Sequence, residues 1–193
     1  DYHDPGADRS DTSITGWMLF AAKSARSAGV DVPDDVFRRV ERHFRSAGAG
    51  DSQAYPRISY VVHARERGEG DTLATLAIGL ASLQVLGWSR EDRWMIAASD
   101  ILTERGPDLD NLYYTYYATL AQFQMGGANW AAWNRALRDP LIARQRTKGD
   151  AAGSWSAEPD IWGRNRGGDV YATAMSVMCL EIYYRYLPIY RKP

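Results

Sequence analysis

The sequence predicts an all-α protein in which inner and outer helices alternate. Three observations lead to this fold class. A short phrase beginning with Asp or Asn recurs four times before an apolar run, amphipathic segments lie between these runs, and glycines end three of the runs. Inner and outer segments are therefore expected to pair as short helical hairpins.

The recurring phrases begin at Asp11, Asp71, Asn111 and Asp169. Asp and Asn are preferred helix N-caps, because a side-chain oxygen accepts a hydrogen bond from an otherwise unpaired backbone N–H. Each phrase thus predicts the start of a helix. Repetition at intervals of 40 to 60 residues indicates stacked helical modules.

Four expected inner helices follow these caps, and each is apolar or small nearly all round, as is typical of helices buried on several sides. They cover residues 12–28, 72–86, 112–125 and 170–187. Three expected outer helices are amphipathic and cover residues 34–46, 90–104 and 130–145. The first outer helix places Val36, Phe37, Val40 and Phe44 on one stripe and its arginines on the other side.

Two long linkers, residues 48–70 and 148–168, are expected to fold over one end of the helix array, with a short strand or hairpin near residues 55–62. No linker suggests a second domain, so residues 1–193 are predicted to form one domain. The pattern alone is compatible with either a solenoid or a closed α/α barrel.

Composition narrows the function classes. A net charge of −1 gives no electrostatic reason to expect nucleic-acid binding, and no apolar run is long enough to predict a membrane span. The single cysteine, Cys179, excludes an internal disulfide and is predicted to be a small buried hydrophobe. The cysteine content therefore does not indicate whether the protein resides in an oxidising or a reducing compartment.

A family resemblance rests on several phrases. Gln145 followed by Gly153-Ser154-Trp155 resembles the Gln and Gly-x-Trp pattern of squalene-hopene cyclases and prenyltransferase repeats, with a longer gap than that family has. Residues 11–17, 111–114, 133–135 and 171–174 resemble bacterial prenyltransferase/squalene oxidase repeat proteins. The likeness extends over essentially the whole chain.

This resemblance implies the α/α toroid of terpenoid cyclases and protein prenyltransferases. The four inner helices counted here are fewer than a closed toroid holds, so the chain is expected to be the C-terminal part of a toroid or a reduced version of one. An upstream toroid segment or a protein partner is then expected to complete it. The resemblance also favours a bacterial cytoplasmic or periplasmic location.

Gln145 and Trp155 also have a purely structural interpretation, which we favour. An amide can tie a helix end to a loop, and an indole can cover the junction.

The motifs that would make the chain an enzyme of this superfamily are missing. No Asp-x-Asp-Asp acid motif is present, and the nearest acidic string, Asp31 to Asp35, is typical of a helix start. The histidines His3, His43 and His63 and the lone cysteine form no credible zinc set. No serine–histidine elbow or phosphate loop is recognisable, so no cofactor or metal is predicted.

If the inner helices run parallel, their four N-termini share one rim, together with Trp17, Tyr113, Tyr114 and Tyr171. We favour the interpretation of these residues as caps and core aromatics. The alternative is a pocket for an apolar or polar-headed ligand lined by the four aromatic residues. In that case Asp71 and Asp169 are weak candidates for a catalytic acid with a raised pKa.

Three functions remain open from the sequence. The first is a non-catalytic repeat module that binds a protein segment or a hydrophobic ligand. The second is a terpenoid-cyclase-like enzyme with its acid upstream, and the third is a polysaccharide-active toroid enzyme. The first inner helix should leave a flank in need of cover, and residues 183–190 either wrap the last helix against the first or form a contact surface.

Overall fold

The computed structural model describes residues 9–51, 55–63 and 66–185. Within these residues the chain forms eight α-helices, one π-helical turn and three short strands. The prediction of a mostly helical protein is confirmed. The chain divides into two compact units, Asp1–Ser99 and Asp100–Pro193, with the boundary inside one helix. A single domain over residues 1–193 stays a prediction.

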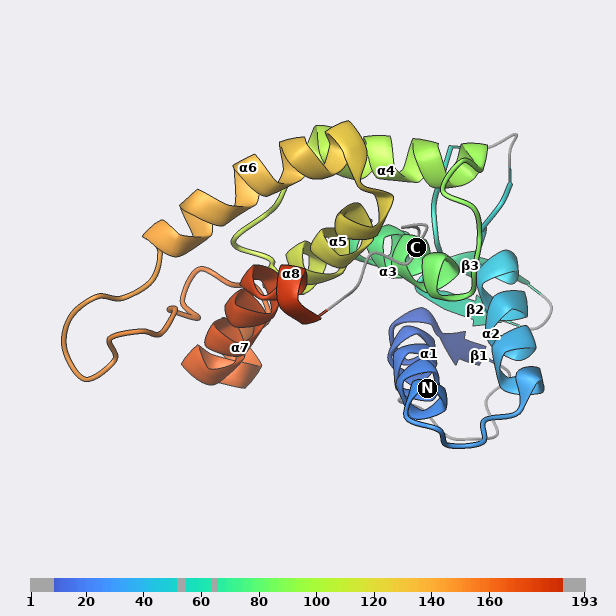
Figure 1. Ribbon diagram of the computed structural model, residues 1–193, viewed down its shortest axis with the longest axis horizontal. Helices are drawn as coiled ribbons and strands as arrows, with labels where there is room; N and C mark the ends of the chain where they lie inside the picture. The colour runs from blue at the N-terminus through green and yellow to red at the C-terminus, as the bar shows by residue number, and fades with distance from the viewer. Residues whose placement is uncertain (1–8, 52–54, 64–65, 186–193) are drawn as a thin grey trace. The chain divides into compact units, whose positions relative to one another are not determined.

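Unit 1 contains three strands and three complete helices (Figure 1). The strands pair antiparallel in the order β1-β2-β3, with Asp11 opposite Val61. The sequence predicts a hairpin near residues 55–62, and the observed one begins at Val61. In chain order the elements are β1 (Arg9–Asp11), α1 (Thr12–Ser27), α2 (Asp34–Ser46), β2 (Val61–His63), β3 (Glu66–Glu69) and α3 (Leu73–Val85).

Helix α4 (Arg93–Arg105) leads from unit 1 into unit 2. Unit 2 then contains α5 (Leu112–Met125), α6 (Gly127–Ala143), the π-turn η1 (Gly163–Gly167), α7 (Gly168–Leu180) and α8 (Ile182–Arg185). A long loop joins α6 to η1 (Figure 1). The predicted last helix is divided, because α7 ends at Leu180, and residues 186–187 of that prediction lie outside the described residues.

The inner helices differ in how completely they are buried. Every residue of α3 from Thr75 to Gln84 is buried, and so is every residue of α5 from Tyr114 to Gln122. In α1 and α7, burial is confined to one side. The buried residues there are Thr12, Ser13, Gly16 and Leu19 in α1, and Ala172, Met175, Ser176 and Cys179 in α7.

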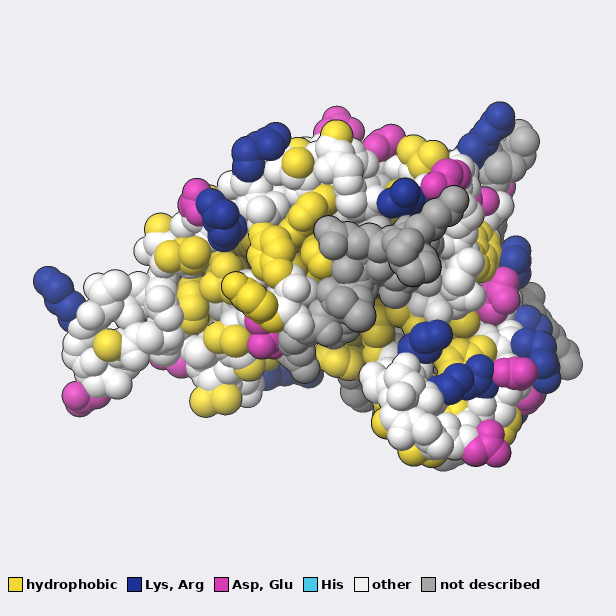
Figure 2. Space-filling view, viewed as in Figure 1, with side chains coloured by type: hydrophobic (Ala, Val, Ile, Leu, Met, Phe, Trp, Pro, Cys, Tyr) yellow, Lys and Arg dark blue, Asp and Glu magenta, His cyan; other side chains and the backbone are white. Residues whose placement is uncertain are grey.

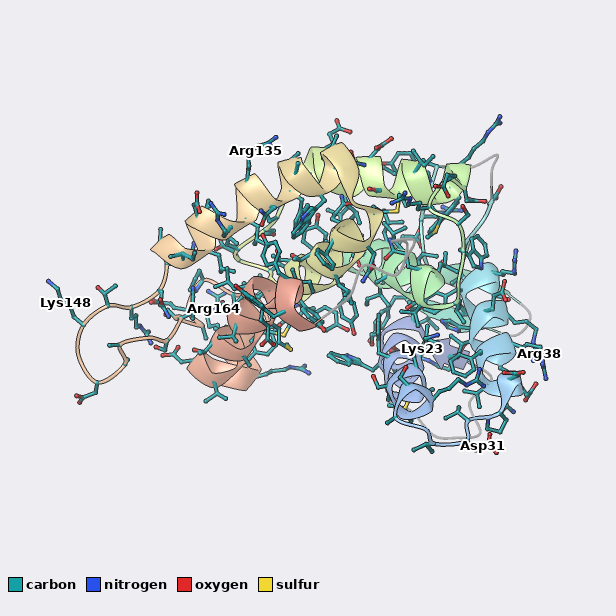
Figure 3. The ribbon with its side chains drawn as sticks, viewed as in Figure 1. Lys23, Asp31, Arg38, Arg135, Lys148 and Arg164 are labelled. Atoms are coloured by element: carbon teal, nitrogen blue, oxygen red, sulfur yellow. The ribbon has the colours of Figure 1, made fainter. Side chains whose placement is uncertain are left out.

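The outer helices have the amphipathic character that the sequence predicted. Helix α4 buries Trp94, Met95, Ala98, Ile101 and Leu102, and α6 buries Trp133, Leu137 and Leu141. In α2 Phe44 is fully buried, whereas Arg38 is exposed and points away from the helix (Figure 3). Charged side chains of both signs gather around α2 (Figure 2), so its charge run is a solvated face. No helix among the described residues is long and apolar enough to cross a membrane.

Glycines set the close approach of helices in unit 1. A Cβ atom added at Gly16 in α1 would lie 2.7 Å from Ile78 Cγ2 of α3. On α3 itself, a Cβ atom at Gly79 would lie 2.5 Å from Ile58 Cγ1. The absence of a side chain at Gly79 therefore lets the segment around Ile58, which is fully buried, pack directly on α3.

Because this contact has no spare room, Gly79→Ala should lower the free energy of unfolding by about 1–3 kcal/mol, although alanine is the better helix former. Urea unfolding followed by circular dichroism measures the change. Ile58→Ala removes the opposing side chain and makes room for a Cβ atom at position 79. The double variant should therefore lose less free energy of unfolding than the two single variants lose together. Equal losses from Gly79→Ala in both backgrounds would contradict the packing described here.

Candidate functional site at the inner-helix N-termini

Two of the four predicted caps are confirmed. Asp11 is buried, and its Oδ1 accepts from the backbone N–H of Ile14 at 3.0 Å and from Ser13 Oγ at 2.6 Å. Asn111 Oδ1 accepts from the backbone N–H of Tyr114 at 3.2 Å. Burial raises the pKa of Asp11, but hydrogen bonds led by that from Ser13 outweigh burial and hold the pKa below its usual value.

The prediction that Asp71 caps α3 is wrong, because the next residue does so. Thr72 Oγ1 accepts from the backbone N–H of Thr75 at 3.1 Å, and Thr75 Oγ1 accepts from the N–H of Thr72 at 2.9 Å. This reciprocal capping box satisfies both amides. Asp71 lies one residue earlier, where it accepts from Ser59 Oγ at 3.1 Å and pairs with Arg57 at 3.5 Å.

Asp169 is also not a cap. It lies in the first turn of α7, whose N-cap is Gly167. Gly168, which has a positive φ of 58°, is already the first residue of the helix. Asp169 is therefore the second residue, and its carboxylate contacts the preceding loop instead of capping the helix. There it accepts from the backbone N–H of Ala157 at 2.9 Å and pairs with Arg146. These bonds, that from Arg146 first, lower the pKa of Asp169.

A fourth carboxylate, which the sequence analysis did not single out, holds the N-terminal end of α5. Asp160 is fully buried. Its Oδ2 accepts from the backbone N–H of Leu112 at 2.7 Å, and its Oδ1 accepts from the N–H groups of Trp162 at 2.8 Å and Gly163 at 2.5 Å. The sequence near Asp160 gives little sign of this role, because Leu112 is 48 residues away in the sequence. The local signal is an Asp just before Ile161 and Trp162.

In each unit a long linker passes over the N-terminal ends of two inner helices, as the sequence predicted. In unit 1, Tyr60 O accepts from the N–H of Thr12 at 2.9 Å, and Ser59 joins Thr12 to Asp71. In unit 2, Asp160 and Asp169 connect residues 157–163 to α5 and α7. The N-terminal ends of α1 and α3 therefore lie together, as do those of α5 and α7.

Gln145 and Trp155 tie the end of α6 to the same linker, as expected. Gln145 Nε2 donates to Gly153 O at 2.8 Å, and the indole Nε1–H of Trp155 donates to Leu141 O at 2.7 Å. Trp155 is buried. Both side chains are thus structural hydrogen-bond donors at this junction.

The aromatic candidates lie in different places. Tyr114 is buried against Trp133 and its hydroxyl donates to Gly106 O at 3.0 Å. Tyr113 contacts the ring of Tyr117, and Tyr171 packs beside Gly167. Burial, and then the nearby charge of Asp160, raises the pKa of Tyr171.

Trp17 belongs to unit 1 and is 41% exposed. As ligand contacts, Trp17, Tyr113, Tyr114 and Tyr171 stay a prediction.

A histidine network in unit 1 was not anticipated. His43 is half-buried, with Nδ1 2.9 Å from Ser10 Oγ and Nε2 2.9 Å from Thr12 Oγ1. The Thr12 hydroxyl donates its proton to Ser59 O at 2.7 Å, so it must accept from His43. The imidazole therefore carries its proton on Nε2, and Nδ1 accepts from Ser10.

This network joins a serine hydroxyl to a histidine base, which is the first element of nucleophilic catalysis. However, burial lowers the pKa of His43 to about 4, against the opposing effect of Asp11. A base with so low a pKa withdraws a proton from serine only weakly at neutral pH. The hydrogen bonds of His43 join β1 and α1 to α2. Among the described residues no cluster of three or more His, Cys, Asp or Glu could hold a metal ion.

No protein-family model matches the chain, and comparison with curated proteins and with solved structures likewise finds no match. The resemblance to prenyltransferase/squalene oxidase repeat proteins thus rests on the sequence phrases alone.

The low pKa of His43 predicts a pH dependence of stability. Unfolded chains bind a proton on this histidine near pH 6.5, whereas the folded chain does so only at about pH 4. The stability that neutral His43 contributes is therefore complete above pH 6.5 and is lost as the pH falls to 4, by about 3 kcal/mol in total. In His43→Gln this part of the decline should be absent when urea unfolding is followed between pH 7.5 and 4. Parallel declines in the two proteins would contradict the assignment.

Proposed function

We propose that the chain is a non-catalytic α/α repeat module that binds a protein segment along α1, and that its helices form part of a toroid like that of prenyltransferase/squalene oxidase repeat proteins. The observation that carries the proposal is the exposed apolar face of α1. Helices α3 and α5, which come from the same repeat pattern, are buried on nearly all sides.

The exposed face of α1 is defined by residues at helical spacing and carries no charge. Met18 is 59% exposed, and Trp17 and Ala21 are exposed beside it. Ile14 and Ala25 continue the same face, since residues three, four and seven apart share one side of a helix. Lys23 is five residues after Met18 and therefore lies on a different side of α1, and Arg26 pairs with Asp34 of α2.

The chemistry of this face selects the kind of partner. An uncharged stripe with two small residues and three large apolar ones is suited to an amphipathic helix, which would lay its own apolar stripe along α1. Burial of a side chain such as that of Met18 contributes about 1.5–3 kcal/mol. We therefore name an amphipathic helical segment of another protein, or of an upstream repeat, as the partner.

The non-catalytic part of the proposal rests on the hydrogen bonds and ion pairs that the carboxylates near the helix N-termini already form. A general acid needs a raised pKa, whereas the pKa values of Asp11 and Asp169 are lowered by the hydrogen bonds that they accept. Asp160 accepts three backbone N–H bonds, and Asp71 is held by Ser59 and Arg57. Each carboxylate thus has a structural partner.

A selection experiment tests the proposal even while the natural partner is unidentified. A displayed library of helical peptides with varied apolar stripes is selected for binding to the purified chain. The selected peptides should lose at least about tenfold in affinity for Met18→Lys, because a charge is introduced into an apolar contact. They should bind Lys23→Glu, a charge change on another side of the same helix, as tightly as the wild type.

Peptides that bind Met18→Lys as well as the wild type would contradict the α1 site. Competition by a farnesyl-type lipid tests the alternative that the face binds a hydrophobic small ligand. A lipid that binds the same face displaces the peptides, whereas no displacement favours a protein segment as the occupant. Turnover of an isoprenoid or glycan substrate that is lost in Asp71→Asn or Asp169→Asn would contradict the non-catalytic function.

A further inference from the structure

Two large apolar side chains, Ile161 and Trp162, are exposed on the linker that covers the N-terminal ends of α5 and α7. Each is 47% exposed. Arg164 (Figure 3) and Arg166 follow in η1 and are exposed as well. We call these four residues the 161–166 patch. Exposed apolar side chains next to cations are typical of interaction sites.

The backbone that carries the patch is held in place by hydrogen bonds. The N–H of Ile161 donates to Asp110 O at 2.9 Å, and the N–H of Trp162 donates to Asp160 Oδ1 at 2.8 Å. The N–H of Arg164 donates to Asp160 O at 3.2 Å. Ile161 and Trp162 are therefore exposed on a fixed frame, so little conformational entropy of this backbone is lost when a partner binds.

The π-turn also brings a cation close to the indole. The N–H of Gly168 donates to Gly163 O, five residues earlier, and closes η1. One turn of this kind takes about four to five residues, so Arg166 lies about one turn after Trp162 and on the same side. Arg164 lies between them, on another side of the turn.

Both arginines of the patch are available to a partner. Among the described residues, neither Arg164 nor Arg166 forms an ion pair. The acidic residue that follows them, Asp169, already pairs with Arg146. Glu158 is exposed and offsets part of the positive charge. The net charge around the patch is therefore small, and attraction would come from individual cations at fixed positions.

These features favour an acidic protein segment as the partner. Trp and Arg are among the residues most enriched in the contacts that dominate protein–protein affinity. A guanidinium binds a carboxylate through two parallel hydrogen bonds, which requires a placed carboxylate. An anionic membrane or a nucleic acid carries many closely spaced charges and is attracted chiefly by strongly basic surfaces, which this patch is not.

We propose that the 161–166 patch is a docking site for an acidic segment of another protein. A large apolar side chain of that segment contacts Ile161 and Trp162, and a neighbouring carboxylate pairs with Arg166. Arg164 adds attraction from the other side of the turn. This site belongs to unit 2 and goes beyond the proposed function, which concerns α1 in unit 1.

A peptide selection tests the charged part of the site. A displayed library, with a large apolar residue between varied polar residues, is selected on the purified chain, and peptides that bind Met18→Lys as tightly as the wild type are kept. These peptides should be rich in Asp and Glu. Their affinity should fall at least about tenfold in Arg166→Glu, because a like charge then faces the carboxylate.

The matched control is Arg135→Glu, which changes the net charge equally. Arg135 is an exposed arginine of α6 in the same unit (Figure 3). The selected peptides should bind this variant as tightly as the wild type. Exchange of their acidic residues for lysine should abolish binding to the wild type and restore binding to Arg166→Glu.

Trp162→Ala and Ile161→Ala test the apolar part of the site. Each should weaken the selected peptides, because each removes a side chain that the peptide would cover. Circular dichroism checks that both variants are folded.

Three results would overturn the proposal. The first is a selection that yields no acidic peptides dependent on Trp162, and the second is an equal loss of affinity in Arg135→Glu and Arg166→Glu. The third is cosedimentation of the chain with phosphatidylglycerol vesicles that is lost in Trp162→Ala, since the patch would then contact a membrane. Met18→Lys affects only the α1 site, so failure of either site is distinguishable from failure of the other.

Discussion

The structure depends on finding hydrogen-bond acceptors for the backbone N–H groups at the starts of its buried helices. An α-helix leaves its first N–H groups without partners inside the helix, and water cannot supply acceptors where the helix end is covered. Asp11 and Thr72 supply them in unit 1, and Asn111 and Asp160 supply them in unit 2. In both units a long linker covers the helix ends and takes part in these bonds. The linkers are therefore structural parts of the helix array rather than loops that stand apart from it.

This requirement also limits the functions open to the rim. Carboxylates, hydroxyls and a histidine gather at the helix N-termini, as they would at a catalytic site, but the hydrogen bonds that they make hold backbone and side chains in place. Their pKa values move in the direction that such bonds produce for Asp11 and Asp169, and in the direction of burial for His43. Apolar side chains are also exposed in each unit, with Met18 of α1 in unit 1 and Val170 of α7 in unit 2.

Periodicity and cap chemistry were enough to predict the helices. The outer helix α2 and the inner helix α5 have the predicted bounds, because each has a cap or an acidic start and a regular apolar pattern. Asp11 and Asn111 were predictable caps for the same reason. Asp71 and Asp169 were not, since a neighbouring Thr72 competes for one cap and a glycine at positive φ shifts the other helix start. The roles of Asp160 and His43 depend on contacts with residues distant in the sequence, and no local pattern encodes these.

The most direct test of this account is the stability of Asp160→Asn beside that of Asp169→Asn, both measured by urea unfolding at pH 7. An amide at position 160 places an N–H₂ group against at least one of the three backbone N–H donors, so Asp160→Asn should lose about 1–3 kcal/mol. Asp169 is exposed, and its amide would lose chiefly a surface ion pair that water screens, so Asp169→Asn should be clearly the more stable of the two variants. An Asp160→Asn protein as stable as the wild type would contradict the account, because the buried carboxylate would then not be holding the ends of the inner helices.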